Sequence, residues 1–214
     1  MNDTELQKQA AAQAAAALVL DNSRVGLGTG STVAHLLPAL AARGLSLRCA
    51  ATSPATERAA RELGLSVHEL DELGRLEIAI DGADQIDPRG WLIKGGGGAH
   101  TREKIVAAAA ARFVVIASAE KAVDTLRPPV PLEILRFGAR TTLAALGEAV
   151  LRDVPPSPDN NLLAYYLGPI ENPRALSERL SGAPGVVDHG LFAPEMVSDI
   201  LIAGSNGVEH RALR

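Results

Sequence analysis

The sequence contains few aromatic side chains, one cysteine, and no apolar run near the roughly 20 residues that a membrane-spanning helix needs. Aromatic residues make up 3% of the 214 positions and apolar residues 47%, so Ala, Val, Leu and Ile must supply the core. Such a core is typical of a parallel sheet covered by helices. Cys49 alone excludes an internal disulfide and a paired-thiol site, and its apolar neighbours indicate a small buried side chain.

Long clusters of basic residues are also missing. The formal net charge is -4, which argues against a surface for nucleic acid, so any bound phosphate is expected to belong to a small molecule. The N-terminal segment lacks the basic start of a secretory signal and carries Asp3 and Glu5, which favours an alanine-rich helix. We therefore expect a cytoplasmic protein that binds neither nucleic acid nor a membrane.

Strand-like and helical segments alternate through the first part of the chain. Short apolar runs are followed by glycine turns and then by helical periodicity, which is the pattern of a mostly parallel sheet. The expected strands are 24–27, 45–52, 65–68, 76–80 and 113–117, and the expected helices are the N-terminal segment, 33–44, 54–63 and 101–111. The sequence therefore predicts an α/β domain.

Prolines change the character of the chain after Arg127, first in PPVPLEIL and again in VPPSPDNN, which indicates a loop. Between and after them we expect strands at 134–136, 162–167, 186–192 and 200–203, and helices at 141–151 and 173–180. The last strand is expected to return to the first domain. We therefore predict an α/β domain of residues 1–127 and 200–214, and a small α+β domain of residues 128–199.

The segment GLGTGST, residues 26–32, places glycines where a strand turns into a helix. Its N–H groups and the hydroxyls of Thr29, Ser31 and Thr32 are expected to point at one spot, which suits a phosphate. It lacks the third glycine of the dinucleotide fingerprint and the lysine of a Walker A loop. A tight connection in which Ser or Thr caps the helix is the alternative.

DGAD, residues 81–84, follows an apolar strand. Asp81 and Asp84 are therefore expected at the carboxyl end of the sheet, where α/β proteins bind ligands. An Asx-turn with a helix cap is the alternative, and that is the role we expect for Asp87. Three aspartates so close together could hold a metal, but no His or Glu completes an obvious set, so no metal is favoured.

KGGGGAHTREK, residues 94–104, has a glycine loop leading into a helix that Thr101 could cap. Four successive glycines favour neither helix nor strand, so something must approach that backbone closely. Glu103 as a base, with Lys94 and loop amides as electrophiles, has the parts of a proton-abstraction site. The alternatives are a first-turn surface acid for Glu103 and a solvated loop side chain for Lys121.

In this order and spacing, GLGTGST, DGADQID, KGGGGAHTREKIVA, residues 117–123 and GVVDHGLFA resemble the A-type ribose-5-phosphate isomerase family over nearly the whole chain. The resemblance implies a Rossmann-like domain with a smaller ferredoxin-like lid. It also implies interconversion of ribose 5-phosphate and ribulose 5-phosphate in the non-oxidative pentose phosphate pathway, with no metal or other cofactor. A homodimer or homotetramer is expected by the same likeness.

The resemblance assigns roles to single residues. The base that moves a proton between C1 and C2 is Glu103. Asp81 and Asp84 handle the sugar hydroxyls and ring opening. The enediolate is steadied by Lys94, Gly95, Gly96 and Gly97. The other expected substrate contacts are Thr29, Gly30, Ser31, Thr32, Gly82, Ala83, Lys121 and, as a lesser helper, Lys8.

Some positions depart from the family pattern. Gln85 replaces an acid and His100 replaces an apolar residue, and neither change removes a proposed catalytic group. The segment SPDNNLLAYY, residues 157–166, stands where a DNGN turn and a strand ending in Asp are usual. This last departure concerns the lid and not the chemistry.

Two rival functions follow from the same features. A non-catalytic sugar-phosphate sensor would normally carry a DNA-binding segment, whereas here the N-terminal helix leads almost directly into the first strand. An amino-sugar-phosphate deaminase or a coenzyme A transferase would have a similar fold, and the pair of DGAD and KGGGGA speaks against both.

Overall fold

The structure is a computed structural model that describes residues 2–213, and these form two compact units. The larger unit contains the chain up to Ala83, Arg102–Ala122 and the chain from Glu195 onward. The smaller unit contains Asp84–Thr101 and Val123–Pro194. Residues 84–101, which the sequence placed in the first domain, therefore belong to the smaller unit, together with most of the segment expected at 128–199.

A seven-stranded sheet with the order β14-β13-β7-β4-β1-β2-β3 forms the centre of the larger unit. Its neighbouring strands are parallel except for the hairpin of β13 and β14, which confirms the expected mostly parallel sheet. Its strands are β1 (Arg24–Leu27), β2 (Arg48–Ala51), β3 (Ser66–Val67), β4 (Leu76–Gly82), β7 (Ala110–Ser118), β13 (Asp199–Gly204) and β14 (Gly207–Ala212). The sequence did not predict β14, because its side chains are largely polar and exposed.

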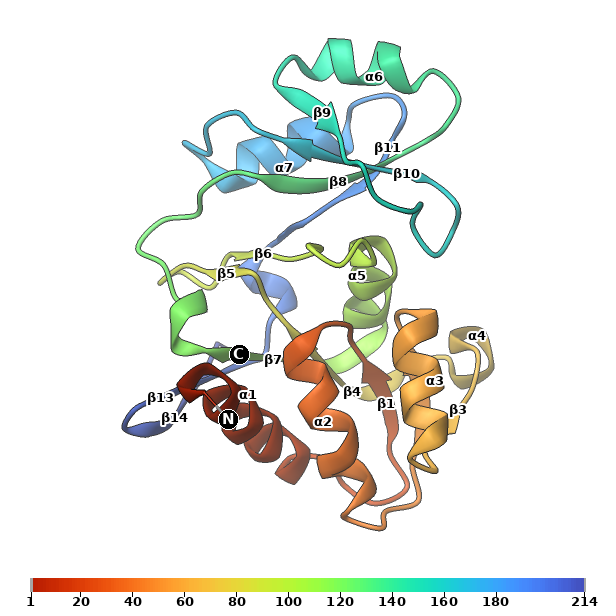
Figure 1. Ribbon diagram of the computed structural model, residues 1–214, viewed down its shortest axis with the longest axis vertical. Coiled ribbons are helices and arrows are strands. Elements are labelled where there is room, and N and C mark those ends of the chain that lie inside the picture. The colour runs from red at the N-terminus through yellow and green to blue at the C-terminus, as the bar shows by residue number, and fades with distance from the viewer. Residues whose placement is uncertain (1, 214) are drawn as a thin grey trace. The chain divides into compact units, whose positions relative to one another are not determined.

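Helices α1 (Asp3–Ala17) and α2 (Ser31–Ala41) pack against one face of this sheet (Figure 1). The buried residues Ala11, Ala12 and Ala15 have small side chains, which let α1 lie close to its neighbours. Cys49 is buried in the same core, and burial raises the pKa of its thiol to about 12, as expected for an inert side chain. Further short helices are α3 (Pro54–Glu62), α4 (Leu70–Leu73), η1 (Ala119–Lys121) and η2 (Pro194–Met196).

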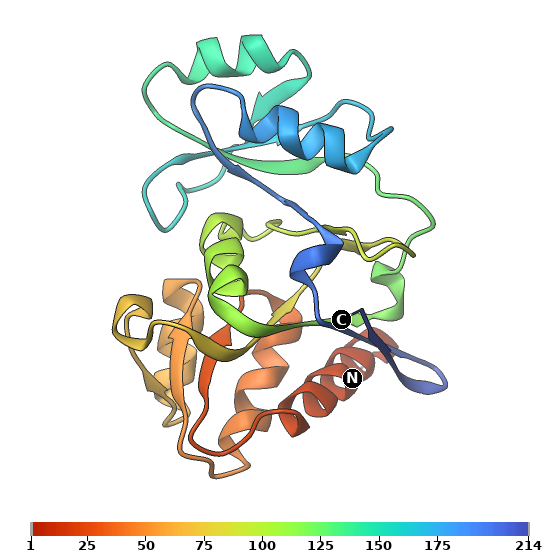
Figure 2. The ribbon, with the colours of Figure 1, turned by 180° about the vertical axis from the view of Figure 1, so that it is seen from behind.

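Helix α5 (His100–Ala109) packs against the opposite face of the sheet (Figure 2). Val25 and Leu27 point into the core under α1 and α2, so Gly26 between them faces the other way. A Cβ atom on Gly26 would lie 2.4 Å from Cγ1 of Val106 in α5. Glycine at this position therefore gives α5 the room to lie close to β1.

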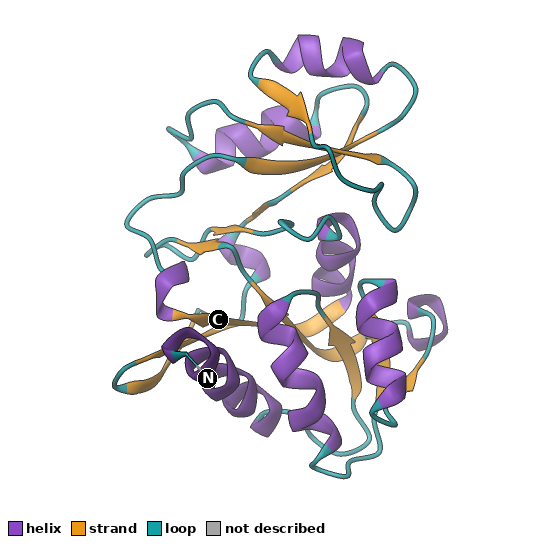
Figure 3. Cartoon of the chain, viewed as in Figure 1, coloured by secondary structure: helices purple, strands orange, loops and turns teal. Residues whose placement is uncertain are grey.

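The smaller unit contains the chain order β8–α6–β9–β10–α7–β11, which is the ferredoxin-like βαββαβ pattern (Figure 3). Its antiparallel sheet has the order β11-β8-β10-β9. The elements are β8 (Val130–Ile134), α6 (Ala139–Leu146), β9 (Ala149–Leu151), β10 (Leu162–Tyr166), α7 (Pro173–Ser181) and β11 (Val186–His189). The predicted small α+β domain is confirmed. No helix in the described part of the chain has the length and apolar character needed to cross a membrane.

The sequence placed two elements of this unit wrongly. The helix expected over 141–151 ends at Leu146, where Gly147 adopts a φ of 80°, and the remaining residues form strand β9. The strand expected at 134–136 is β8, which begins four residues earlier. The start of β8 was not predicted because it contains a proline, and proline cannot donate a backbone hydrogen bond to a neighbouring strand. Pro131 is tolerated because it lies one residue beyond the last residue of β8 that pairs with β11.

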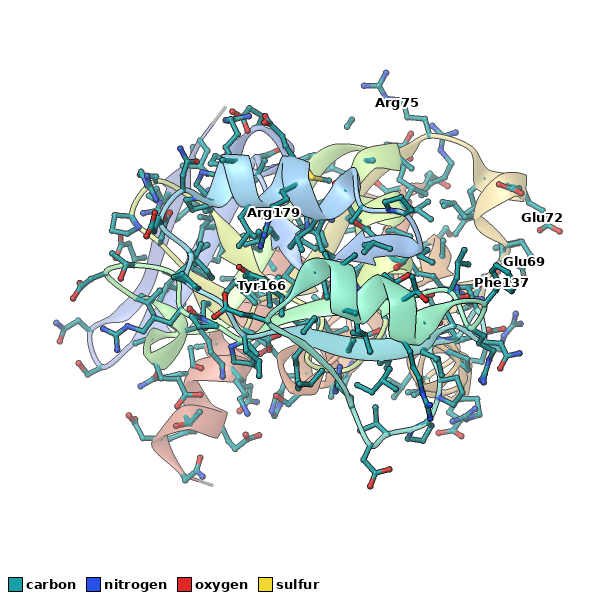
Figure 4. All side chains as sticks on the ribbon, turned by 90° about the horizontal axis from the view of Figure 1, so that it is seen from above. Glu69, Glu72, Arg75, Phe137, Tyr166 and Arg179 are labelled. Atoms are coloured by element: carbon teal, nitrogen blue, oxygen red, sulfur yellow. The ribbon has the colours of Figure 1, made fainter. Side chains whose placement is uncertain are left out.

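A second, three-stranded sheet explains why residues 84–101 belong to the smaller unit. Strands β5 (Gln85–Ile86), β6 (Leu92–Ile93) and β12 (Leu191–Phe192) pair in the order β12-β6-β5. Elsewhere in this unit the Arg179 guanidinium lies 5.0 Å from the ring centre of Tyr166, and both residues are labelled in Figure 4. Phe137, also labelled there, is 92% exposed.

Candidate active site

The loop that follows β1 is tied to the carboxylate of Asp81 at the end of β4. The N–H groups of Thr29 and Gly82 both donate to Oδ1 of Asp81, at 3.1 and 2.7 Å. Asp81 is buried, and a Cβ atom on Gly28 would lie 2.0 Å from its carboxyl carbon. The structure thus brings GLGTGST and DGAD together through backbone amides and one carboxylate.

The Thr29 hydroxyl of this loop is bound within the larger unit, which departs from the expectation that it points at a ligand. Thr29 Oγ1 lies 2.8 Å from Oγ1 of Thr52, and Thr56 Oγ1 donates to the Gly28 carbonyl at 2.9 Å. The Thr29 side chain is therefore directed toward the connection between β2 and α3. Helix α2 begins at Ser31, so the N–H groups of its first turn lie at this loop.

Glu103 lies in the first turn of α5 and is buried. Val106 of the same helix stands against Gly26, and α5 runs toward the amino edge of the sheet because β7 begins directly after it. Glu103 is about 4.5 Å nearer to the carboxyl edge than Val106, which brings it level with the loop after β1.

Asp81 occupies the same level and the same face. The parallel register pairs Leu27 with Ile80, so Asp81 follows β1 at the level of Gly28. Ile80 points into the core under α1 and α2. Asp81, the next residue, therefore points toward the face on which α5 packs. Within the larger unit, Asp81 and Glu103 lie at the carboxyl edge of the sheet, beside the inner strands β4 and β1.

The two lysines expected near this edge of the sheet, Lys121 and Lys8, lie in η1 and α1. Lys121 is in η1, directly after β7, and its Nζ lies 3.4 Å from Oε1 of Glu120. The Ala119 N–H of η1 donates to Oε1 of Gln7 in α1, at 3.1 Å. Lys8, the next residue of α1, contacts Oε1 of Glu5 at 2.6 Å. Hydrogen bonds from Lys8, and then from His35, lower the pKa of Glu5.

The glycine loop of the smaller unit is a tight turn bound to Asp84. The Gly98 N–H donates to the Gly95 carbonyl at 3.0 Å, and these two glycines have φ angles of 80° and 99°. Such angles require glycine. The Gly96 N–H donates to Oδ2 of Asp84 at 2.8 Å, while Gly96 and Gly97 are exposed. A Cβ atom on Gly95 would lie 2.6 Å from Cβ of His100, which is fully buried.

Lys94, just before this loop, is a buried lysine. Lys94 is only 2% exposed, and its Nζ lies 5.4 Å from the ring centre of Phe192. The Lys94 N–H donates to the Gly190 carbonyl at 2.9 Å, which fixes the backbone beside β12. A cation in such surroundings interacts strongly with a developing negative charge.

A buried acid, Glu133 of β8, holds the start of α5. Its carboxylate accepts hydrogen bonds from Thr101 Oγ1 at 2.6 Å, Ser157 Oγ at 2.7 Å and Asn161 Nδ2 at 2.8 Å. The expectation that Thr101 caps α5 is therefore wrong, because the helix begins at His100 and the Thr101 hydroxyl is used by Glu133. The SPDNN turn supplies the other two donors.

Several of these residues were not found from the sequence. Thr52 follows a parallel strand, so its position at the sheet's carboxyl edge could have indicated it. Arg152 donates to the carbonyls of Gly95 and Gly96, at 3.3 and 2.6 Å, but it stands in an irregular segment with no motif. In the part of the chain that the structure describes, no three His, Cys, Asp or Glu side chains gather as metal ligands.

The two units carry complementary chemical groups. The larger unit has a buried glutamate and an aspartate held by amides, and the smaller has a buried lysine and an aspartate beside a glycine loop. Carboxylates of this kind can accept a proton from carbon or oxygen, and lysine and amide donors can stabilise an oxyanion.

Comparison with known proteins identifies the family of this chain. The family model described as Ribose 5-phosphate isomerase A (phosphoriboisomerase A) matches residues 48–207. Ribose-5-phosphate isomerase A of Synechococcus sp. (strain JA-3-3Ab) is 49% identical over 219 residues, which cover 94% of this chain and 95% of that protein.

Solved structures agree with the sequence comparison. Ribose 5 phosphate isomerase A from Neisseria gonorrhoeae superposes with a TM-score of 0.95 at 29% identity and covers 100% of this chain and 99% of that one. A D-ribose-5-phosphate isomerase in complex with phospho-erythronic acid has a TM-score of 0.92 at 31% identity, covering 99% and 100%. Because its sequence and its fold both match these proteins, the chain belongs to the ribose 5-phosphate isomerase A family.

Proposed function

We propose that Glu103 is the base with which this isomerase interconverts D-ribose 5-phosphate and D-ribulose 5-phosphate. In the open-chain aldose a base removes the proton from C2, and the same proton is returned to C1 of the enediolate, while a second proton moves between the two oxygens. The observation that carries the assignment is the position of Glu103, which is buried in the first turn of α5 at the level of Asp81. The proposed reaction uses no cofactor.

Asp81 and Asp84 are proposed to act on the hydroxyl groups of the sugar and on ring opening. Each carboxylate accepts a hydrogen bond from a loop N–H, which fixes one of its oxygens. Ring opening needs a proton taken from the C1 hydroxyl and one given to the ring oxygen, and carboxyl groups held in this way suit both transfers. Gly82 and Ala83, between the two acids, are proposed to contact the substrate through their backbone.

Lys94 and the loop of Gly95, Gly96 and Gly97 are proposed to stabilise the enediolate. Removing a carbon-bound proton is slow unless the negative charge that forms on oxygen is stabilised by groups already in place. A lysine only 2% exposed and a turn rich in backbone N–H groups are such groups.

The substrate phosphate is proposed to bind at the loop after β1. Backbone groups of Thr29, Gly30, Ser31 and Thr32, with the hydroxyl groups of Ser31 and Thr32, precede or open α2, where the helix dipole favours an anion. Lys121, with Lys8 as a lesser helper, would add positive charge. Phosphate binding remote from the reacting carbons would position C1 and C2 near the base. The phospho-erythronic acid complex of a relative supports a small sugar phosphate as the ligand.

The proposal extends to assembly and location. We expect a cytoplasmic homodimer or homotetramer, with segment 128–199 serving as a lid and in self-association. Exposed apolar side chains on the smaller unit, including Phe137, Val150 and Leu151, support a surface for a second copy of the chain.

The test is ribulose 5-phosphate formation from ribose 5-phosphate in EDTA, with the Glu103→Gln variant beside the parent. We expect an active parent and a loss of at least about a hundredfold in the variant. Glu57→Gln is the matched control, because Glu57 is an exposed glutamate in the first turn of another helix, and it should keep full activity. A fully active Glu103→Gln protein would reduce Glu103 to a structural acid, and a parent that binds the sugar phosphate without turning it over would be a sensor.

A further inference from the structure

Arg152 follows the edge strand β9, and its position is fixed within the smaller unit by two contacts. Its backbone N–H donates to the Leu163 carbonyl at 2.9 Å, which continues the pairing of β9 with β10. Its guanidinium lies 4.7 Å from the ring centre of Tyr165. A guanidinium over an aromatic ring is held in orientation as well as in place. The side chain therefore reaches toward the glycine loop from an anchored base.

The guanidinium donates to two successive carbonyl groups of the glycine loop. Nη1 lies 3.3 Å from the Gly95 oxygen, and Nη2 lies 2.6 Å from the Gly96 oxygen. The planar fork of arginine matches such a pair, whereas lysine would present a point charge. Among residues 2–213, Arg152 forms no ion pair with a carboxylate, so its charge acts on these carbonyls.

The orientation of the two carbonyls decides where the loop N–H groups point. A trans peptide is planar, and its N–H is directed opposite to its carbonyl. The Gly95 carbonyl accepts hydrogen bonds from both the Gly98 N–H, at 3.0 Å, and Arg152, at 3.3 Å, and the N–H of the same peptide, that of Gly96, donates to Asp84. The Gly96 carbonyl also points to Arg152, so the Gly97 N–H is directed away from the guanidinium. A cation on a carbonyl oxygen also polarises the peptide and strengthens the N–H as a donor.

We propose that Arg152 is a positioning residue of the isomerisation. It orients and polarises two glycine amides: the Gly96 N–H, which fixes Asp84, and the Gly97 N–H, which stabilises the enediolate. This inference rests on the proposed roles of the glycine loop and Asp84. Because those amides matter most when the oxyanion forms, loss of Arg152 should lower kcat and kcat/KM to a similar extent and leave KM nearly unchanged.

The test compares Arg152→Met, Arg152→Lys and the control Arg136→Met. Arg136 is another arginine of the smaller unit that donates to a loop carbonyl, that of Asn160 at 2.7 Å. We expect kcat to fall between about tenfold and a hundredfold in Arg152→Met, since losing a direct oxyanion donor costs about a hundredfold or more. KM should stay within about threefold of the parent. Arg152→Lys should fall between Arg152→Met and the parent, and Arg136→Met should retain the parent's kcat.

Phospho-erythronic acid provides a second readout, because its carboxylate places negative charge where the enediolate carries it. Its inhibition constant should rise in Arg152→Met by a larger factor than KM does, an effect that general loosening of the fold would not produce. A double-mutant cycle with Asp84→Asn should show less than additive loss. Urea unfolding measures the folded fraction of each variant, and the measured rates are corrected for that fraction.

The possible failures can be told apart. If Glu103→Gln is inactive while Arg152→Met turns over like Arg136→Met, the positioning role is overturned and the proposed function stands. A raised KM with unchanged kcat in Arg152→Met would instead make the arginine a substrate-binding group and also overturn the inference. If Glu103→Gln is fully active, the proposed base is wrong, whatever Arg152 does.

Discussion

The two proposed catalytic aspartates are held by the same kind of bond in different surroundings. Each accepts a hydrogen bond from an N–H of a glycine-rich loop, Asp81 from Thr29 at 3.1 Å and Asp84 from Gly96 at 2.8 Å. Asp81 is only 3% exposed, whereas Asp84 is exposed. One carboxylate is therefore part of a packed core, and the other lies at a surface.

The neighbouring glycines differ in the same way. A Cβ atom on Gly28 would lie 2.0 Å from the carboxyl carbon of Asp81, but one on Gly96 would lie 3.1 Å from the nearest carboxyl oxygen of Asp84. Neither glycine has a positive φ, so each is needed for room and not for backbone freedom. It follows that Asp81 has one position, whereas Asp84 can adjust to a sugar.

Replacing Gly28 by alanine should have the largest effect. The new methyl group would overlap the buried Asp81 carboxyl group, with no flexible side chain between them to move aside. We therefore expect the free energy of unfolding to fall by about 3 kcal/mol and isomerase activity to be lost. Urea denaturation and the ribulose 5-phosphate assay measure the two effects. Gly204→Ala is the control, because its Cβ would meet only Ala119, at 3.7 Å. A Gly28→Ala protein as stable as the parent would remove the distinction between the two aspartates.

Asp199 extends the comparison, because it is a buried aspartate held by the side chains of Arg112 and His210. Hydrogen bonding to Arg112, and then to His210, lowers the pKa of Asp199. A lowered pKa stabilises the fold above the unfolded value of about 3.9 and ceases to do so as pH falls through the folded value. We expect Asp199→Asn to lose about 2 kcal/mol at pH 7.

This loss should shrink as pH falls below about 4, because the unfolded parent then takes up a proton that the folded carboxylate still resists, and it should vanish once the folded carboxylate is protonated too. Urea unfolding of parent and variant between pH 7 and pH 3 measures the difference. A constant difference over that range would mean that the charge of Asp199 does not contribute, and that shape and hydrogen bonding alone hold the site.

Replacing Gly96 by alanine should have the smallest effect on stability. The new methyl group would meet an exposed Asp84 that can move, so the free energy of unfolding should change by less than about 1 kcal/mol. Activity should fall about tenfold, because Asp84 leaves its bond with the Gly96 N–H, a change of about 1.4 kcal/mol in the barrier. When Asp84→Ala is already present, adding Gly96→Ala should not lower activity further. A further tenfold loss of activity would show that the effect of Gly96→Ala comes from the loop and not from Asp84.

Much of the fold could be predicted because its signals are local. The strand 24–27 and the helix 173–180 have apolar periodicity bounded by turn or cap residues, and the structure agrees at nearly every position. Residues 149–151 were predicted as the end of a helix, since pairing with β10 decides their structure and no local pattern shows it. Strand β14 was missed for the same reason.

The candidate site was predictable where it consists of motifs. Asp81, Asp84, Lys94 and Glu103 stand within five residues of glycines that a fold alone does not need, which singles them out. Arg152 could not be found in this way, because its role depends on the distance between a guanidinium and two carbonyls far along the chain. The direction of the Thr29 hydroxyl likewise depends on Thr52, which follows another strand.

The buried carboxylate of Glu133 sets a rule for how this part of the sequence can diverge. Two of its three donors come from the turn SPDNN, which differs from the DNGN turn usual in the family. What the acid requires is two polar hydrogens at the right distance, and different turns can deliver them. Loss of the acid itself would be different, because Thr101 and both turn residues would lose their acceptor together.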